Sequence, residues 1–254
     1  MFLNLVQYSP EWENKDSNRD KLIKMISGSP PAEGSVLVFP EMTLTGFTME
    51  SNKFAEDLNG KSFHFFSELA SINKAHVIAG LIEKGNDLNY NTLIHINPNG
   101  ELITSYRKIH PFSYSSENKF YARGIKTVIT EINNWKVGLS ICYDLRFPEL
   151  FRQYGKERVE LIIVIANWPD SRIGQWSTLL SARAIENQCY VVAVNRTGND
   201  RKLHYNGYSG IYDPMGNEVD FLPDEEKIIS AEISMENVKQ VRNKFPFLDD
   251  IFLI

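Results

Sequence analysis

The chain of 254 residues is 43% hydrophobic and 12% aromatic, which is ordinary for a globular protein and enough to build one large α/β domain. Its formal net charge of -5 comes from 27 Lys plus Arg against 32 Asp plus Glu, so the composition excludes a broad basic surface for nucleic acid or anionic membrane. An anionic substrate would therefore have to be held by a local cation.

Short apolar runs rich in β-branched residues alternate with helical patterns, which is typical of an α/β fold. In chain order we predict strand 2–7, helix 16–26, strand 36–39, helix 63–73, strands 77–82, 91–96, 102–107, 127–132 and 136–141, helix 148–154, strand 161–166, helix 174–187, strands 190–195, 208–212 and 227–233, and helix 235–243. Turn residues at 97–100 and 213–217 predict two hairpins. So many strands predict two packed mixed sheets with helices outside.

The segment 111–124 mixes polar and aromatic residues without a period. A connection of this length inside a compact domain is typical of a lid or a pocket wall. The sequence contains no internal repeat and no linker rich in Gly, Ser or Pro. We therefore expect a single domain over residues 1–254.

Two strand ends carry charged residues that are candidates for catalysis. The apolar strand 36–39 ends at Pro40 and exposes Glu41, and strand 102–107 is followed by Lys108. Strand ends of α/β folds are where sites are built, and a partly buried Glu41 would have a raised pKa and take a proton near neutral pH. A buried Lys108 would stabilise negative charge on a thiolate or on a carbonyl oxygen. Taken alone, either residue is more often solvated.

Cys142 lies where strand 136–141 ends and turns toward the helix that begins near Pro148. A thiol near a helix N-terminus is favoured as a thiolate, the form that attacks carbonyl groups, and backbone N–H groups there can meet an oxyanion. The alternative is a small buried apolar residue.

The cysteines and the termini also bear on location. Cys142 and Cys189 are the only cysteines and lie far apart, so we expect no disulfide framework, and Cys189 fits a buried position in the core. The N-terminus lacks the pattern of a signal peptide, and no apolar run approaches the roughly 20 residues of a membrane span. We expect a cytoplasmic protein.

Three motifs occur in the order found in the nitrilase, or carbon-nitrogen hydrolase, superfamily. They are Phe-Pro-Glu at 39–41, Tyr-Arg-Lys at 106–108 and the strand-to-helix turn that carries Cys142. The sequence closely resembles that superfamily over nearly its whole length, including the segments 44–47 and 182–193. The resemblance implies a four-layer αββα sandwich that pairs as a homodimer. It also implies that Cys142 is the nucleophile, that Glu41 is the general base and that Lys108 stabilises the oxyanion.

The superfamily carries a second glutamate that orients the lysine and the substrate, and Glu117, seven residues before Gly124, matches its place. The alternative is that Glu117 is a solvated residue on a mobile loop. The segment 142–150 looks like the branch of omega-amidases and their deaminated-glutathione amidase relatives, and the segment 166–172 is more like bacterial omega-amidases. This likeness implies cleavage of the terminal amide of 2-oxo acid amides, such as 2-oxoglutaramate and 2-oxosuccinamate, to an acid and ammonia through a Cys thioester.

A 2-oxo acid amide carries a carboxylate, so the pocket should contain a cation that can bind it in a bidentate manner. Arg172 is the first candidate and Arg146 the second, although Arg146 could equally pair with Glu41 or Asp144. The Tyr143 backbone N–H is expected at the oxyanion. Other candidates for contact with the substrate are the aromatic residues Phe112, Tyr121 and Trp168.

No cofactor or metal is expected, because neither a His-Glu-x-x-His nor a Cys-x-x-Cys pattern is present. Three alternatives to the omega-amidase stay open. The first is hydrolysis of a nitrile or of a larger amide such as deaminated glutathione, and the second is a papain-like pair of Cys142 with His204. The third is a non-catalytic binding protein on the same scaffold.

The C-terminal residues 245–254 are unusually apolar for a free tail. We predict that they pack on a partner subunit.

Overall fold

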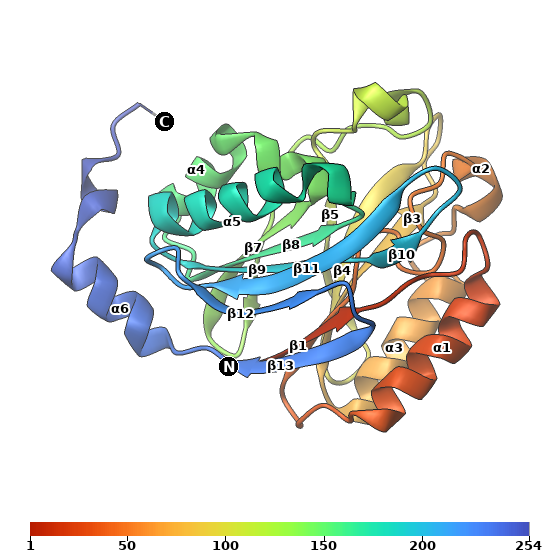
Figure 1. The fold of residues 1–254 in the computed structure, drawn as a ribbon, viewed down its shortest axis with the longest axis horizontal. Helices are drawn as coiled ribbons and strands as arrows, with labels where there is room; N and C mark the ends of the chain where they lie inside the picture. The colour runs from red at the N-terminus through yellow and green to blue at the C-terminus, as the bar shows by residue number, and fades with distance from the viewer. Residues whose placement is uncertain (254) are drawn as a thin grey trace.

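The computed structural model describes residues 1–253. Two mixed β-sheets face each other, and helices cover their outer faces (Figure 1). The chain therefore forms the predicted four-layer αββα sandwich. Within the described residues, no helix is long and apolar enough to cross a membrane.

The first sheet has six strands in the order β13-β1-β2-β3-β4-β5. They are β1 (Phe2–Gln7), β2 (Val36–Val38), β3 (His76–Glu83), β4 (Tyr90–Ile96), β5 (Leu102–Arg107) and β13 (Lys227–Glu232). Strands β1, β2 and β3 run parallel, while β4, β5 and β13 pair in antiparallel fashion. Helices α1 (Lys15–Gly28) and α3 (Lys61–Asn73) cover the outer face of this sheet (Figure 1). The short α2 (Ser51–Phe54) lies between them in the chain.

The second sheet has seven strands in the order β10-β11-β9-β8-β7-β6, with β12 also paired to β11. They are β6 (Ile129–Ile132), β7 (Trp135–Ile141), β8 (Leu161–Ala166), β9 (Tyr190–Asn195), β10 (Thr197–Asn199), β11 (His204–Tyr212) and β12 (Glu218–Pro223). Helices α4 (Pro148–Lys156) and α5 (Ile173–Asn187) cover its outer face, and α6 (Met235–Lys244) follows β13 (Figure 1).

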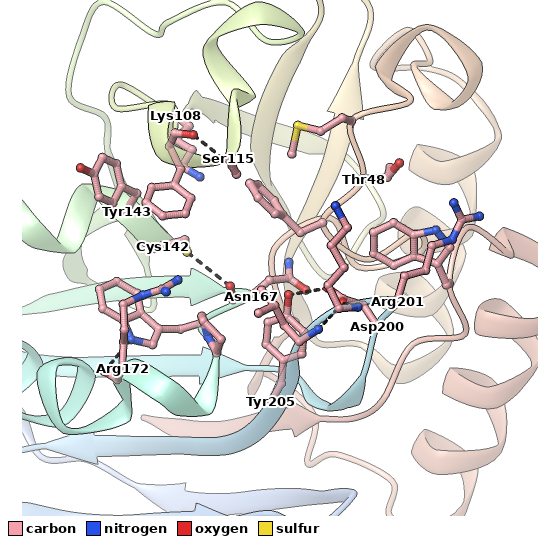
Figure 2. A pocket seen from close by; sticks show the side chains of 18 of the residues that line it. Thr48, Lys108, Ser115, Cys142, Tyr143, Asn167, Arg172, Asp200, Arg201 and Tyr205 are labelled. Atoms are coloured by element: carbon pink, nitrogen blue, oxygen red, sulfur yellow. Dashed lines mark hydrogen bonds between the residues drawn. The ribbon is translucent and has the colours of Figure 1, made fainter.

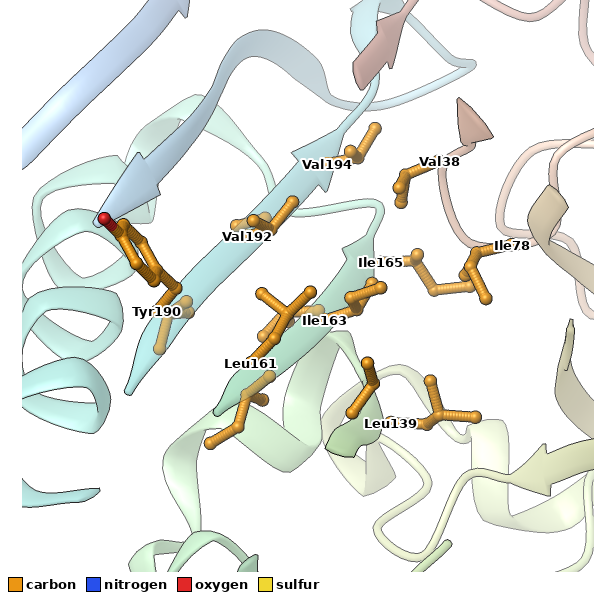
Figure 3. Close-up of a cluster of buried hydrophobic side chains, with 14 of the residues drawn as sticks. Val38, Ile78, Leu139, Leu161, Ile163, Ile165, Tyr190, Val192 and Val194 are labelled. Atoms are coloured by element: carbon orange, nitrogen blue, oxygen red, sulfur yellow. The ribbon is translucent and has the colours of Figure 1, made fainter. Parts of the chain in front are cut away.

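The space between the sheets is filled by β-branched and aliphatic side chains. Val38 and Ile78 of the first sheet face Ile163, Ile165 and Val194 of the second (Figure 3). All five are fully buried, and burying a side chain of this size contributes about 1.5–3 kcal/mol. This rigid core fixes the carboxyl ends of β2, β7 and β8 relative to one another.

Strands β10 and β12, the first half of β11 and the single turn of α2 were not predicted. The pairing of β11 with β12 shifts register between Gly207 and Ser209, and Tyr208 between them has a positive φ of 58°. A bulge of this kind interrupts the alternation by which a strand is recognised in sequence. Strand β12 has no buried residue in its pattern, so it shows no apolar period. The two predicted hairpins, β4–β5 and β11–β12, are confirmed.

The C-terminal segment follows α6 (Figure 1) and first contacts the sandwich, since Leu248 is buried and Asp249 pairs with Arg158. Phe252 and Leu253 are 90% and 91% exposed. The contact of residues 245–254 with a second subunit stays a prediction, and its last residue, Ile254, lies outside the described residues.

Candidate active site

The turn after β2 delivers Glu41 into the protein interior. Gly80 on β3 makes this possible, because a Cβ atom there would lie 2.5 Å from the backbone nitrogen of Met42 and 2.8 Å from Cα of Glu41. The turn therefore packs directly on the neighbouring strand, and Glu41 is 1% exposed. The alternative of a solvated Glu41 is wrong.

Lys108 lies at the centre of a buried charge cluster with two carboxylates. Its Nζ is 2.8 Å from Oε1 of Glu41 and 2.9 Å from Oε2 of Glu117. Burial alone would lower the pKa of Lys108, but the charges of the two glutamates outweigh it and raise that pKa well above the ordinary value. Lys108 is therefore a permanent cation, and the structure brings together three of the predicted side chains from separate segments.

Asn91 and Asn167 complete the surroundings of Glu41. Asn91 Nδ2 donates to Glu41 Oε1 at 2.7 Å and also to Glu117 Oε1 at 2.9 Å, while the Asn167 backbone N–H donates to Glu41 Oε2 at 2.8 Å. Burial alone would raise the pKa of Glu41, but the charge of Lys108 and these hydrogen bonds lower it below its ordinary value. The predicted raised pKa of Glu41 is thus wrong, and this carboxylate is ionised at neutral pH.

Glu117 organises the segment 111–124. It is fully buried, its carboxylate accepts from the Phe112 backbone N–H, and its own N–H donates to the Phe112 carbonyl at 3.2 Å. Gly124 N–H closes the segment by donating to Lys108 O at 2.8 Å. Burial, together with the negative charge of Glu41, raises the pKa of Glu117. Glu117 is therefore not a solvated residue on a mobile loop.

Cys142 follows β7 in a left-handed conformation, with φ of 48°. Non-glycine residues pay a conformational cost there, and such residues are concentrated at functional sites. The thiol donates to the Asn167 carbonyl, with 3.9 Å between Sγ and O. Asn167 therefore contacts both Cys142 and Glu41.

The resting sulfur is not a helix-stabilised thiolate, contrary to our expectation. A 3₁₀ turn, η3 (Cys142–Arg146), follows the cysteine directly, and α4 begins only at Pro148. Burial raises the pKa of the Cys142 thiol well above its ordinary value, and the charge of Glu41 adds to the rise, although Lys108 opposes it. A base must therefore remove the proton when the thiol reacts.

A cavity of about 390 Å³ opens over Cys142, Lys108 and Asn167, a volume within the usual range for small-molecule sites. Phe112, Tyr143, Arg146, Trp168 and Arg172, all predicted substrate contacts, line it. Figure 2 shows Tyr143 and Arg172 on one side of Cys142, and Thr48, Asp200 and Arg201 on the other.

Two arginines, Arg146 and Arg172, line the cavity. Arg172 lies over the Phe112 ring, with its Cζ atom 5.5 Å from the ring centroid, and Arg146 lies 4.7 Å from the centroid of Trp168. Arg146 also donates to the Gln175 side chain at 2.6 Å. The alternative in which Arg146 pairs with Glu41 or Asp144 is not observed, since Asp144 instead accepts from Tyr106, His110 and Ile141.

Two other residues considered from the sequence, Tyr121 and His204, do not line the cavity. Tyr121 is buried in a small cluster with Met42 and Phe54, and its hydroxyl donates to the Thr48 carbonyl at 2.7 Å, so it supports the cavity from behind. His204 hydrogen-bonds to Asn199 and is not a lining residue. A papain-like pairing with Cys142 finds no support.

Several residues of the site were not predicted. Asn91 and Asn167 are buried beneath the cavity, and Trp12, Phe47 and Tyr205 line it. No local signal marked Asn91, because β4 also carries the polar residues Thr92 and His95. Within residues 1–253, no group of three His, Cys, Asp or Glu side chains is arranged to hold a metal ion.

The chain is similar to known proteins over most of its length. The family model described as carbon-nitrogen hydrolase matches residues 3–243. The chain is 33% identical over 240 residues to the 2-oxoglutaramate amidase of Bacillus subtilis, covering 93% of this chain and 92% of the relative. It is 37% identical over 239 residues to the 2-oxoglutaramate amidase of Paenarthrobacter nicotinovorans, covering 89% and 80%.

A crystal structure has the same fold over the entire chain. It is that of a CN-hydrolase superfamily protein from Xanthomonas campestris with an arsenic adduct in its active site. The TM-score is 0.92 at 30% identity, with 100% of this chain and 98% of that chain covered. With this fold, a family match over nearly its full length and two relatives above 30% identity, the chain belongs to the carbon-nitrogen hydrolase family.

Proposed function

We propose that the protein is an omega-amidase that hydrolyses the terminal amide of 2-oxo dicarboxylic acid monoamides, such as 2-oxoglutaramate and 2-oxosuccinamate. The observation that carries this proposal is one cavity with two kinds of chemistry. It is lined by the Cys142 thiol and by Lys108, which pairs with Glu41 and Glu117, and also by Arg146 and Arg172. Among the described residues, neither arginine has a carboxylate within 4.0 Å. Both are available for an anionic group of the substrate.

The reaction begins when ionised Glu41 takes the proton of Cys142 as the sulfur attacks the amide carbon. The carbonyl oxygen becomes an oxyanion that Lys108 and the Tyr143 backbone N–H stabilise. The first N–H groups of a helical turn lack an acceptor within that turn, and Tyr143 is the second residue of η3. The geometry thus supports both donors.

Collapse of the tetrahedral intermediate breaks the C–N bond, and Glu41 returns its proton to the departing nitrogen so that ammonia leaves. The acyl group stays on sulfur as a thioester. Glu41 then takes a proton from water as the oxygen attacks the thioester carbon, and the C–S bond breaks to release the acid. The returned proton restores the thiol, which agrees with the raised pKa of Cys142.

Ammonia release from a panel of substrates tests the proposed function. We expect the highest kcat/KM with 2-oxoglutaramate or 2-oxosuccinamate, and much lower values with glutamine and with a simple nitrile. A deaminated-glutathione analogue, followed through its amine product, distinguishes the alternative of a larger amide. Absence of turnover with every amide would leave the non-catalytic binding protein as the better explanation.

Arg172→Gln tests recognition of the carboxylate in the same assay. We expect KM for 2-oxoglutaramate to rise about tenfold or more, because a hydrogen bond to a charged group is worth about 1.5–3 kcal/mol. Arg146→Gln, the second candidate, is measured in parallel, and the variant with the larger rise in KM identifies the arginine that binds the carboxylate. Neither variant should change kcat/KM for a small neutral amide, and equal losses on charged and neutral amides would contradict a carboxylate contact.

We also propose that the enzyme is a cytoplasmic homodimer. Its two unpaired cysteines suit a reducing compartment, and the exposed Phe247, Phe252 and Leu253 give the tail an apolar surface that a second copy would cover. Light scattering should give twice the mass of the chain, and a double substitution of Phe252 and Leu253 by Ser should reduce it. A monomeric wild-type protein would overturn this assignment.

A further inference from the structure

Asp144 is fully buried and accepts four hydrogen bonds. Its Oδ2 accepts from the Tyr106 hydroxyl at 2.7 Å and from the Ile141 N–H at 3.1 Å. Its Oδ1 accepts from the backbone N–H of His110 at 2.9 Å and from its ring Nδ1 at 2.8 Å. Four donors fill the capacity of a carboxylate, so both oxygens are fixed in place.

Every one of these donors lies within two positions of a residue of the proposed mechanism. Ile141 directly precedes Cys142, while Tyr106 and His110 lie two residues on either side of Lys108. The one carboxylate of Asp144 therefore joins the end of β7, which carries the nucleophile, to the end of β5, which carries the cation. These two strands belong to different sheets.

The His110 side of this junction is held by a second contact. Its ring stacks on Phe147, with centroids 3.8 Å apart and planes 7° from parallel, and Phe147 follows η3 directly. Burial and the Asp144 charge raise the pKa of Tyr106 well above its ordinary value, so its hydroxyl stays a donor. Both segments that flank the nucleophile turn are thereby fastened to the Lys108 segment.

We propose that Asp144 is a positioning residue, which sets the distance between the Cys142 sulfur and the Lys108 ammonium and holds Cys142 in its left-handed conformation. The inference rests on the proposed function, because it concerns the geometry of that reaction. Asp144 does not touch the substrate. Its contribution should appear in the rate of the chemical step and leave substrate binding almost unchanged.

Asp144→Asn tests the inference, since an amide offers one acceptor oxygen and leaves two of the four donors without a partner. We expect kcat for 2-oxoglutaramate to fall about 100-fold with KM changed less than about threefold, as displacements of about 1 Å cost this much. The pH profile of Cys142 alkylation by iodoacetamide should also shift, because the pKa of that thiol depends on its burial and on the charges of Glu41 and Lys108. A lowered Tm with kcat per folded protein and the alkylation profile unchanged would overturn the inference.

If Asp144→Asn does not fold, Tyr106→Phe tests the positioning role of Asp144 instead. This variant removes one donor and keeps the carboxylate, and we expect kcat to fall about three- to tenfold, since one hydrogen bond is worth about 1 kcal/mol. Unchanged kcat and an unchanged alkylation profile would overturn the inference. Cys142→Ala distinguishes failure of the proposed function from failure of this inference. An active Cys142→Ala protein would contradict the proposed function. An inactive Cys142→Ala protein together with a fully active Asp144→Asn protein would contradict only the positioning role of Asp144.

Discussion

Cys142→Ala is expected to lower kcat/KM for 2-oxoglutaramate by at least about 10⁴-fold, because no other group can form the acyl intermediate once the nucleophile is removed. The folded state should be little affected. The change removes one sulfur atom from a residue that already lies at the edge of a cavity. Residual ammonia release and the melting temperature, measured on the same preparation, test both statements.

Cys189→Ala is the matched control for this substitution. Cys189 is fully buried directly before β9 and has no part in the mechanism. We expect kcat/KM within about twofold of the wild type, with a loss of stability of about 1 kcal/mol, as for a small truncation in a core. If both variants kept full activity, the thioester route would be wrong.

Lys108→Met should damage both catalysis and folding. Loss of the oxyanion donor should reduce kcat by about 10²–10³-fold or more. The substitution also leaves Glu41 and Glu117 buried without their shared cation, and breaking a buried ion pair costs about 3–5 kcal/mol. We therefore expect a large fall in Tm together with the loss of activity.

A second substitution separates these two effects. In the double variant Lys108→Met with Glu117→Gln, one of the unpaired carboxylates is gone, so most of the stability should return while kcat stays low. Lys108→Met alone should also become more stable as the pH falls, because unpaired buried carboxylates have raised pKa values and take up protons in the folded state. Full recovery of kcat in the double variant would exclude Lys108 as the oxyanion donor.

The sandwich and the central charged residues were predictable because both leave local signals. Central strands such as β8 are continuous apolar runs, and Glu41 and Lys108 follow strand ends, where α/β proteins concentrate their chemistry. Their resemblance to family segments added Glu117. Edge strand β12 left no such signal, since solvent covers most of its side chains and any polar residue suits that position.

The partners of the charged residues were not predictable, because they come from distant segments. Asn91 lies 50 positions from Glu41, and Asn167 lies 126 positions from it, and no local pattern marks a hydrogen bond across such a separation. The direction of the pKa shift of Glu41 depends on the same contacts. Burial alone predicts a rise, and only the placement of Lys108 shows that the shift is a decrease.

The pairing of β13 with β1 bears on how the protein is made. Phe2 pairs with Glu232 and Gln7 with Lys227, while β2 lies on the other side of β1. One edge of β1 therefore has no partner strand until residues 227–232 have been synthesised. An exposed strand edge invites pairing with other chains. β13 follows every other strand in chain order, so this edge of the first sheet is the last to be paired during synthesis.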